Sequence, residues 1–240
     1  MNIKGETMNW TELPRLEKVN NRLEDEVIQD GTIAKNLEYG IHLYQGAIKK
    51  EDCDQIIKDL ENELSLGIPS IHWSTANVND NKSMDEVRNC VDLRYKKENL
   101  GNGLPFNQTL FDIHEKVEQA LDKCLRHYES LWHLKMHYKE AFNFVKYLPG
   151  KYFKIHGDHG PYYACTISAV VYLNDDYEGG EIEFIRQGLV VKPKAGDIIL
   201  SPSNFVYEHA SLEVKSGTKY AVVIMTDYND LHHKGHGAGY

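Results

Sequence analysis

Hydrophobic residues recur along this chain with two different periods. Between residues 50 and 64, and again from residue 107 to about 130, they fall at the spacing of one face of a helix. From residue 141 to 228 the pattern changes to short apolar runs separated by Gly, Pro, Asn and Asp, which is typical of strands joined by turns. The chain is therefore predicted to be mainly β with flanking helices, around a double-stranded β-helix (jelly-roll or cupin-like) core.

The individual elements follow from these runs. The apolar positions of the first helix are Cys53, Ile56, Ile57, Leu60 and Leu64, and those of the second are Leu110, Ile113, Val117, Leu121 and Leu125. The strand-like runs cover residues 142–147, 163–173, 181–185, 197–200 and 220–226. Both helices are expected to pack against the sheet.

Regions outside these runs complete the predicted organisation. Residues 1–36 form a polar N-terminal arm, in which Val19, Leu23 and Val27 are spaced for a helical stripe. A single domain is expected over residues 37–230, with its catalytic core at about 141–228.

Two further segments are polar or biased in composition. Residues 70–89 are rich in Asn, Ser and Asp, which predicts a long loop that closes over a site as a lid. Residues 231–240 form a His- and Gly-rich tail, where adventitious chelation of metal is more plausible than catalysis.

Composition narrows the function classes. The 240 residues carry a formal charge of −9, which disfavours nucleic acid as the main partner because phosphate binding needs a basic surface. Four cysteines form no C-x-x-C pair, so zinc knuckles and disulfide frameworks are not expected. No signal peptide or long apolar run is found, so the expected location is cytoplasmic, with no membrane partner.

The candidate chemistry begins with His156-Gly-Asp158. In an extended strand these two side chains point to the same side and can occupy adjacent positions on one metal ion. A third ligand from a distant strand, His209, would complete the facial triad of non-haem Fe(II) oxygenases. An H-x-D triplet alone is weak, because with 12 histidines in the chain about one is expected by chance.

The context of the triplet is what gives it weight. Tyr147-Leu-Pro-Gly precedes it, and Ser168-Ala-Val-Val-Tyr172-Leu-Asn, a Gly-Gly-Glu-Ile-Glu-Phe run and finally Lys219 follow it in order. This series resembles the prolyl 4-hydroxylase-like branch of the 2-oxoglutarate and Fe(II)-dependent dioxygenases. The resemblance is close over residues 147–228 and looser from residue 37 onward.

The resemblance implies roles for particular residues. It implies that His156, Asp158 and His209 hold the iron, and that Lys219 pairs with the far carboxylate of 2-oxoglutarate. A strand lysine usually reaches solvent, but inside a barrel its charge requires an anionic partner, which a dicarboxylate supplies.

Three more residues are implied at the same cosubstrate. Tyr147 and Tyr172 are expected to hydrogen-bond 2-oxoglutarate, with Ser168 beside them. One departure is visible, since many relatives carry arginine where Cys165 stands, and a thiol cannot replace a guanidinium.

The implied reaction is hydroxylation of an unactivated C–H bond, with Fe(II) and 2-oxoglutarate as cofactors, O2 as oxidant, and succinate and CO2 as co-products. Ascorbate is a further expected cofactor. The expected substrate is a prolyl residue in a peptide or protein, and the alternative is a free amino acid or other small molecule. Asp158 disfavours a halogenase, in which a small residue replaces the carboxylate.

Two readings from other classes stay open. A zinc hydrolase could use the same two histidines and aspartate, although it would need neither the lysine nor the tyrosines. A non-catalytic cupin-like binding protein would keep the barrel without turnover. Outside the motif, His114, His127 and His137 are expected to be hydrogen-bonded or surface residues, and His159 is a weak candidate for a place near the metal.

Overall fold

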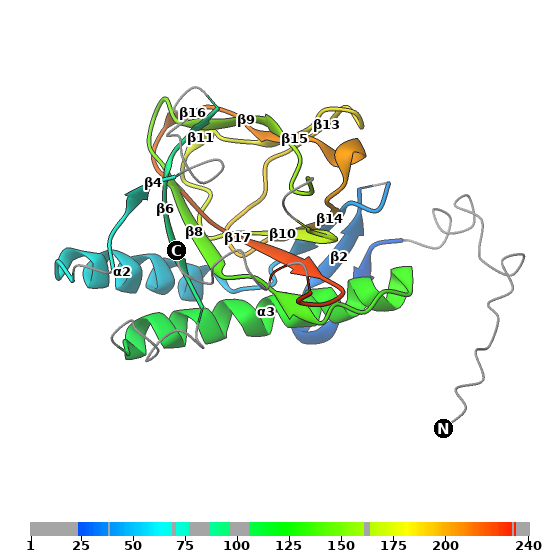
Figure 1. Ribbon diagram of the computed structural model, residues 1–240, viewed down its shortest axis with the longest axis horizontal. Coiled ribbons are helices and arrows are strands. Elements are labelled where there is room, and N and C mark those ends of the chain that lie inside the picture. The colour runs from blue at the N-terminus through cyan, green and yellow to red at the C-terminus, as the bar shows by residue number, and fades with distance from the viewer. Residues whose placement is uncertain are drawn as a thin grey trace, which may run out of the picture.

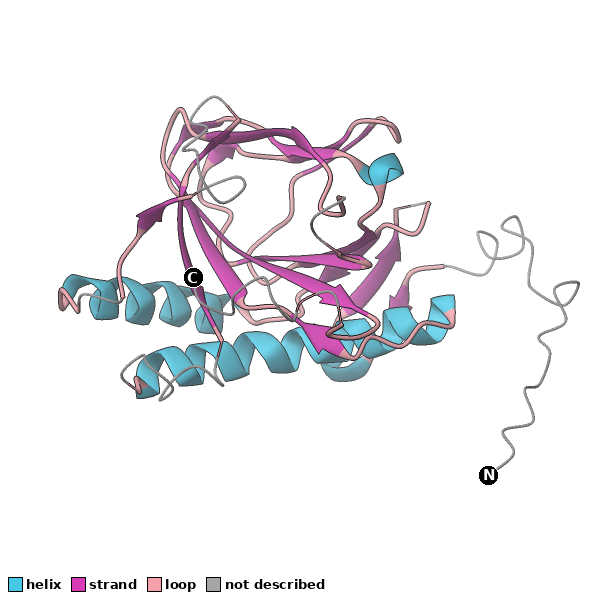
Figure 2. Cartoon of the chain, in the orientation of Figure 1, coloured by secondary structure: helices cyan, strands magenta, loops and turns pink. Residues whose placement is uncertain are grey.

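The computed structural model describes residues 24–37, 39–68, 71–76, 87–96, 106–160, 164–231 and 233. Within these residues the elements stack in three layers (Figures 1 and 2). Two α-helices, α2 (Lys50–Ser65) and α3 (Gln108–Trp132), lie along one face of a large sheet, and a smaller sheet covers its other face.

The large sheet contains ten strands in the order β1-β2-β3-β14-β10-β17-β8-β6-β4, with β7 also paired to β17. Their bounds are Glu26–Val27 (β1), Ile33–Asn36 (β2), His42–Gln45 (β3), Ser74–Thr75 (β4), Val91–Tyr95 (β6), Tyr138–Lys139 (β7), Phe142–Tyr147 (β8), Ile167–Tyr172 (β10), Ile198–Pro202 (β14) and Lys219–Asp227 (β17).

The smaller sheet has the order β13-β12-β15-β9-β5, and β11 pairs with β16 beside it. These strands are Arg88–Asn89 (β5), Tyr152–His156 (β9), Glu178–Gly179 (β11), Ile182–Phe184 (β12), Leu189–Val191 (β13), His209–Ser211 (β15) and Val214–Ser216 (β16). Neighbouring strands are antiparallel, for example β10 with β14 and β15 with β9. This architecture confirms the predicted jelly-roll class.

Both predicted helices are present, and their ends have local causes. Glu51 and Asp52 stand in the first turn of α2, where acidic side chains favour the helix dipole. In α3, Asn107 caps the start by accepting a hydrogen bond from Leu110 N at 2.9 Å. The helix ends at His133, whose left-handed backbone (φ 52°, ψ 43°) stops further helical hydrogen bonding.

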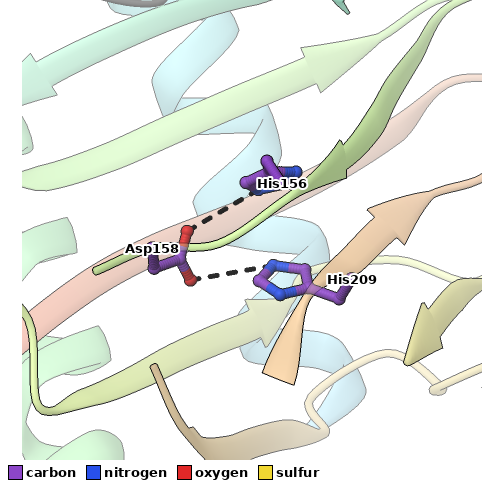
Figure 3. A group of neighbouring side chains, drawn as sticks. All are labelled: His156, Asp158 and His209. Carbon is purple, nitrogen blue, oxygen red and sulfur yellow. Dashed lines mark ion pairs between the residues drawn. The ribbon is translucent and has the colours of Figure 1, made fainter. Parts of the chain in front are cut away.

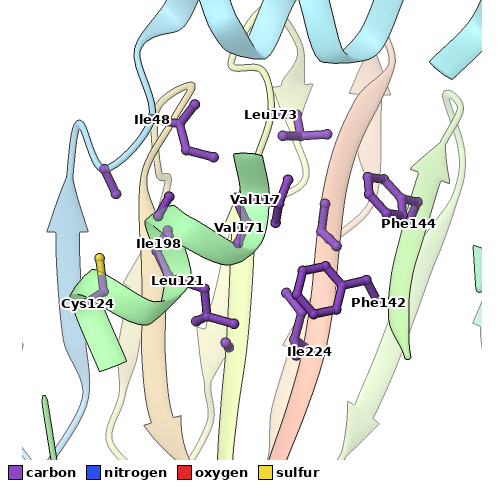
Figure 4. Close-up of a cluster of buried hydrophobic side chains, with 14 of the residues drawn as sticks. Ile48, Val117, Leu121, Cys124, Phe142, Phe144, Val171, Leu173, Ile198 and Ile224 are labelled. Carbon is purple, nitrogen blue, oxygen red and sulfur yellow. The ribbon is translucent and has the colours of Figure 1, made fainter. Parts of the chain in front are cut away.

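The main core lies between the helices and the large sheet (Figure 4). Val117 and Leu121 of α3 pack there against residues such as Val171 of β10 and Ile224 of β17. Two smaller clusters, one around Tyr147 and one around Phe184, lie on the other face of the sheet. The space between the two sheets is therefore partly apolar and partly available for polar chemistry.

Strand β17 shows how the two faces are separated. Val222 and Ile224 belong to the core under the helices, whereas Ala221 and Val223 belong to the cluster on the opposite face. Side chains alternate along a strand, so Lys219 shares the inner face with Ala221 and Val223. The register of β17 thus decides which side chains face the barrel interior.

The start of the domain differs from the sequence expectation. Val27 lies in β1 and is exposed rather than on a helical stripe, while Val19 and Leu23 fall outside the described residues. Strands β1 and β2 extend the large sheet beside β3, so residues 26–36 are part of the sheet. Val27 pairs with Ile33 of β2 in a local hairpin, so at this residue the chain is a strand rather than a helix.

Two other predicted segments are only partly described. Of the lid predicted over residues 70–89, only 71–76 and 87–89 are described, so lid closure stays a prediction. In the tail, the His233 ring stacks on Tyr138 with centroids 4.1 Å apart. None of the helices among the described residues is long and apolar enough to span a bilayer.

Candidate active site

Three side chains with metal-binding chemistry meet between two strands of the smaller sheet (Figure 3). His156 ends β9 and His209 begins β15, and antiparallel pairing places the two residues directly opposite each other. Asp158 lies beside both, with Oδ1 3.6 Å from His156 Nε2 and Oδ2 3.7 Å from His209 Nε2. Their ligand atoms all lie within 4.8 Å of one another, so this group could hold a divalent metal through one face.

A backbone carbonyl orients each histidine ring. Nδ1 of His156 is 2.8 Å from the carbonyl oxygen of Lys154, and Nδ1 of His209 is 3.1 Å from that of Tyr207. Because a carbonyl only accepts, we assign the proton to Nδ1 and the lone pair to Nε2, which faces Asp158. Burial, with His209 close by, lowers the pKa of His156 to about 4. His156 is therefore a neutral ligand at physiological pH.

Asp158 reaches this position differently from the expectation. Strand β9 ends at His156, so Asp158 lies in the following loop rather than in an extended strand. His159 holds this loop in place. Its backbone N–H donates to the carbonyl of Ser203 at 3.0 Å, and its ring Nδ1 is 2.8 Å from the carbonyl oxygen of Cys165. His159, a weak candidate from the sequence, anchors the loop that carries Asp158.

A buried arginine and an aromatic ring support His156, and the sequence analysis singled out neither. The Phe153 ring stacks on His156 with centroids 3.5 Å apart, and the Arg88 guanidinium lies 5.1 Å from the centroid of Phe153. Arg88 also pairs with Asp92 at 3.2 Å. The sequence signal was present, because Arg88, Cys90 and Asp92 place polar groups at every second position of a strand-like stretch.

Lys219 lies inside the barrel and is only 3% exposed. Its Nζ donates to the carbonyl of Gly180 at 2.7 Å and to Ser211 Oγ at 2.9 Å, and lies 5.2 and 5.3 Å from the ring centroids of Tyr147 and Tyr172. No carboxylate among the described residues forms an ion pair with it. Burial lowers the pKa of Lys219 to about 7. An anionic ligand would therefore stabilise this side chain in its charged form.

The two tyrosines expected at the cosubstrate flank this lysine. Tyr147 is the direct cross-strand partner of Lys219. Burial raises the pKa of both Tyr147 and Tyr172 well above the usual value, so both phenols remain protonated donors. The structure thus brings Lys219 and both tyrosines together.

Ser168, the fourth residue expected beside 2-oxoglutarate, lies next to the metal-binding group rather than next to Lys219. Its Oγ donates to Asp158 Oδ2 at 2.5 Å, four residues along β10 from Tyr172. Cys165 stands next to it, with Sγ 3.7 Å from Ser168 Oγ. Ser168 therefore hydrogen-bonds the metal-binding group and not Lys219.

A second group with metal-ligand chemistry lies on α3. Donor atoms of His114, Glu115 and Glu118 fall within 4.8 Å of one another. Lys139 forms an ion pair with Glu118, and the His114 ring stacks on Phe142 with centroids 3.9 Å apart. These contacts explain the group as packing between α3 and the sheet.

Comparison with known proteins agrees with this geometry. Residues 142–226 match the family model of the 2OG-Fe(II) oxygenase superfamily. This span lies inside the predicted catalytic core and includes all three metal-binding candidates and Lys219. No curated protein sequence matches the chain.

Solved structures with the same fold include several prolyl hydroxylases. A prolyl hydroxylase from Trichoplax adhaerens, in complex with a hypoxia inducible factor peptide fragment, superposes with a TM-score of 0.64 at 14% identity over 82% of this chain and 88% of that chain. The viral collagen prolyl hydroxylase of Paramecium Bursaria Chlorella virus-1, in complex with 2OG, gives 0.54 at 20% identity over 79% and 96%. A Pseudomonas putida prolyl-4-hydroxylase gives 0.54 at 15% identity over 80% and 94%.

The match of residues 142–226 to the family model confirms the resemblance to 2OG-Fe(II) oxygenases expected from the motifs, with Fe(II) and 2-oxoglutarate as the cofactors that the family name gives. At these identities the structural likeness itself establishes the fold.

Proposed function

We propose that this 2-oxoglutarate- and Fe(II)-dependent dioxygenase hydroxylates a prolyl residue in a peptide or protein. The oxygenase match and the prolyl hydroxylase-like fold support this choice of substrate. One of the structurally similar prolyl hydroxylases is in complex with a peptide fragment, which supports a peptide over a free amino acid.

His156, Asp158 and His209 are proposed to hold the iron. The donor set fits, because the two Nε2 atoms and the carboxylate converge within 4.8 Å. Iron and 2-oxoglutarate, when bound, supply the oxygen activation and the oxidising equivalents, with succinate and CO2 as co-products. The chain itself keeps the metal ligands in the protonation state and orientation that binding requires. For the two histidines, the carbonyls of Lys154 and Tyr207 hold each ring so that Nε2 faces the metal position.

The far carboxylate of 2-oxoglutarate is proposed to bind Lys219, with hydroxyl donors from Tyr147 and Tyr172. The fit rests on a buried ammonium that forms no ion pair with any described carboxylate. Its present hydrogen bonds to Gly180 and Ser211 leave one of three ammonium hydrogens for the ligand. The walls around it exclude water, which strengthens a charge-assisted hydrogen bond.

One observation carries the proposal: Lys219, a buried lysine with no ion-pair partner among the described residues, hydrogen-bonds Ser211 of β15, the strand that also carries His209 of the His-Asp-His group. A zinc hydrolase would use the His-Asp-His group but has no need of the lysine. A dicarboxylate cosubstrate accounts for both.

The test is mass spectrometry of proline-containing peptides after incubation with the protein, Fe(II), 2-oxoglutarate and O2. The expected result is a gain of one oxygen at proline, matched by succinate formation. Control reactions use the same peptides with proline replaced by alanine, and the Asp158→Ala variant, and both should give no product.

Free proline and other amino acids are assayed in parallel under the same conditions. Oxidation of a free amino acid with no reaction on any peptide would replace the peptide proposal with the small-molecule alternative. Absence of iron-dependent succinate formation with every substrate would overturn the proposed assignment of the metal and cosubstrate residues.

A further inference from the structure

Behind Asp158 lies a buried row of three small polar side chains that the proposed reaction does not use. Ser168 Oγ is 2.5 Å from Asp158 Oδ2 and 2.8 Å from Ser203 Oγ, and Ser203 Oγ is 3.1 Å from Cys165 Sγ. All three are at most 2% exposed. They come from β10, from the residue after β14 and from the loop before β10, so sheet packing alone brings them together.

The chemistry of the groups sets the direction of these hydrogen bonds. An ionised carboxylate only accepts, so the Ser168 hydroxyl must donate to Asp158. The Ser168 oxygen then accepts from Ser203, and the Cys165 thiol lies within hydrogen-bond distance of both the Ser203 oxygen and the carbonyl of Ile167, the latter at 3.5 Å. Burial, with Asp158 nearby, raises the pKa of Cys165 to about 12, so the thiol stays protonated.

The backbone around the row is also fixed. Ser203 N donates to the carbonyl of Thr166 at 3.1 Å, and Ser203 O accepts from His159 N at 3.0 Å. Because His159 directly follows Asp158, one serine is joined both to the row and to the loop that carries the carboxylate. A displacement of the loop that carries Asp158 would therefore also disturb the hydrogen bonds of the row.

We propose that the row Cys165–Ser203–Ser168 fixes the orientation of the Asp158 carboxylate, with Ser168 as a positioning residue for the metal. This inference rests on the proposed iron site. One lone pair of Oδ2 is taken by Ser168, so the carboxylate cannot rotate freely between the two histidines and presents one defined edge to the ion.

The experiment measures metal binding without turnover. Calorimetry with Mn(II) gives the dissociation constant, and the visible absorption of bound Co(II) reports the ligand geometry. Ser168→Ala is expected to weaken Mn(II) binding about 10- to 100-fold, as for other groups that orient a metal ligand, and to change the Co(II) spectrum. Ser168→Thr, which keeps the hydroxyl, should restore both.

Ser201→Ala is the matched control. Ser201 is a buried serine directly across from Ser168 on β14, and its hydroxyl is not hydrogen-bonded to Asp158. The Ser201→Ala variant should bind Mn(II) like the wild type. Ser203→Ala should weaken binding less than Ser168→Ala, and it should add nothing in the Ser168→Ala background because the row is already broken. Thermal unfolding of each variant checks that the fold is retained.

The outcomes separate this inference from the proposed function. If the wild type binds Mn(II), His209→Ala does not, and Ser168→Ala binds as the wild type does, the positioning role is wrong and the metal site stands. The same conclusion follows if Ser168→Ala instead raises only the dissociation constant for 2-oxoglutarate, since Ser168 would then be a cosubstrate ligand. If His209→Ala binds Mn(II) like the wild type, the proposed metal site itself fails.

Discussion

Inside the barrel, His156, Asp158 and His209 face one another at what we call the metal-binding end, and Lys219 is buried at the lysine end, where it donates to Gly180 and Ser211. The metal-binding end holds one carboxylate that faces the unprotonated Nε2 atoms of two imidazoles and accepts a hydrogen bond from Ser168, so its negative charge is left for a bound cation to balance. The lysine end has three hydrogen-bond donors but no carboxylate partner among the described residues. Both ends therefore require a ligand of opposite charge, a cation at the first end and an anion at the second.

The two ends also differ in how the chain builds them. Each histidine is oriented by the carbonyl two residues before it, which is a local contact. Lys219 instead contacts Gly180, Tyr147 of β8 and, eight residues away in the sequence, Ser211 of β15. The ring orientations at the metal end are thus set locally, but both ends depend on strand register, because the pairing of His209 with His156 brings the metal-binding group together.

The largest expected effect is the loss of the metal end. Asp158→Ala and His209→Ala should each abolish measurable metal binding and succinate formation, because two remaining ligands do not form a facial site. Metal content after dialysis and calorimetric titration check this result, and circular dichroism checks the fold. His72→Ala, which changes an exposed histidine, should behave as the wild type; tight metal binding by either site variant would mean that its residue is not a ligand.

Next in size is a loss confined to the lysine end. Lys219→Met keeps most of the side-chain length and removes the charge, so 2-oxoglutarate should bind about ten- to over a hundredfold more weakly. Mn(II) affinity should not change, since the lysine is not a metal ligand. Titration of 2-oxoglutarate into the Mn(II)-loaded protein measures the effect, and an unchanged affinity would remove Lys219 from the site.

The buried lysine also predicts a pH dependence. Because the pKa of Lys219 is lowered to about 7, the ligand-free protein loses the proton above that pH, and 2-oxoglutarate must restore it on binding. The dissociation constant should therefore rise by up to about tenfold per pH unit above pH 7. Calorimetry in buffers of different ionisation enthalpy should show that 2-oxoglutarate binding takes up protons above pH 7. In Lys219→Met the part of this uptake that is due to the lysine should be absent.

A smaller effect is expected on stability. The lowered pKa of Lys219 means that the unfolded chain binds more protons than the folded chain from pH 7 up to the ordinary lysine pKa, so this group makes stability rise with pH in that range. Lys219→Met should remove that slope and, near pH 7, raise the free energy of unfolding of the ligand-free protein by about 1 kcal/mol or more. Urea unfolding at several pH values measures both. A variant less stable than the wild type at every pH would show that the lysine stabilises the empty barrel.

The sequence predicted the elements with strong periodicity. Apolar spacing located α2 and α3 to within one or two residues, and the alternating runs located β8 and β17. The H-x-D motif and the distant His209 came together as expected, because the motif lies where two neighbouring strands meet.

Features set by tertiary packing were not predictable in the same way. Ser168 lies on the same face of β10 as Tyr172, and only the loop after β9 brings Asp158 to it. The stack of Arg88 on Phe153 joins β5 to β9 through pairing that no local pattern encodes. Strand pairing between distant segments, rather than propensity, decided each of these contacts.

The alternation along β17 has a consequence for how the gene can change. A single-residue insertion between Ala221 and Val223 would exchange the inner and outer faces of one half of the strand, sending either Lys219 toward the helices or Val223 out of the barrel. A two-residue insertion would preserve the faces but displace Lys219 along the strand by about 6.6 Å. Substitutions at the outer positions can be absorbed by repacking against α2 and α3, so in this strand we expect the length to be more strictly maintained than the identity of its apolar residues.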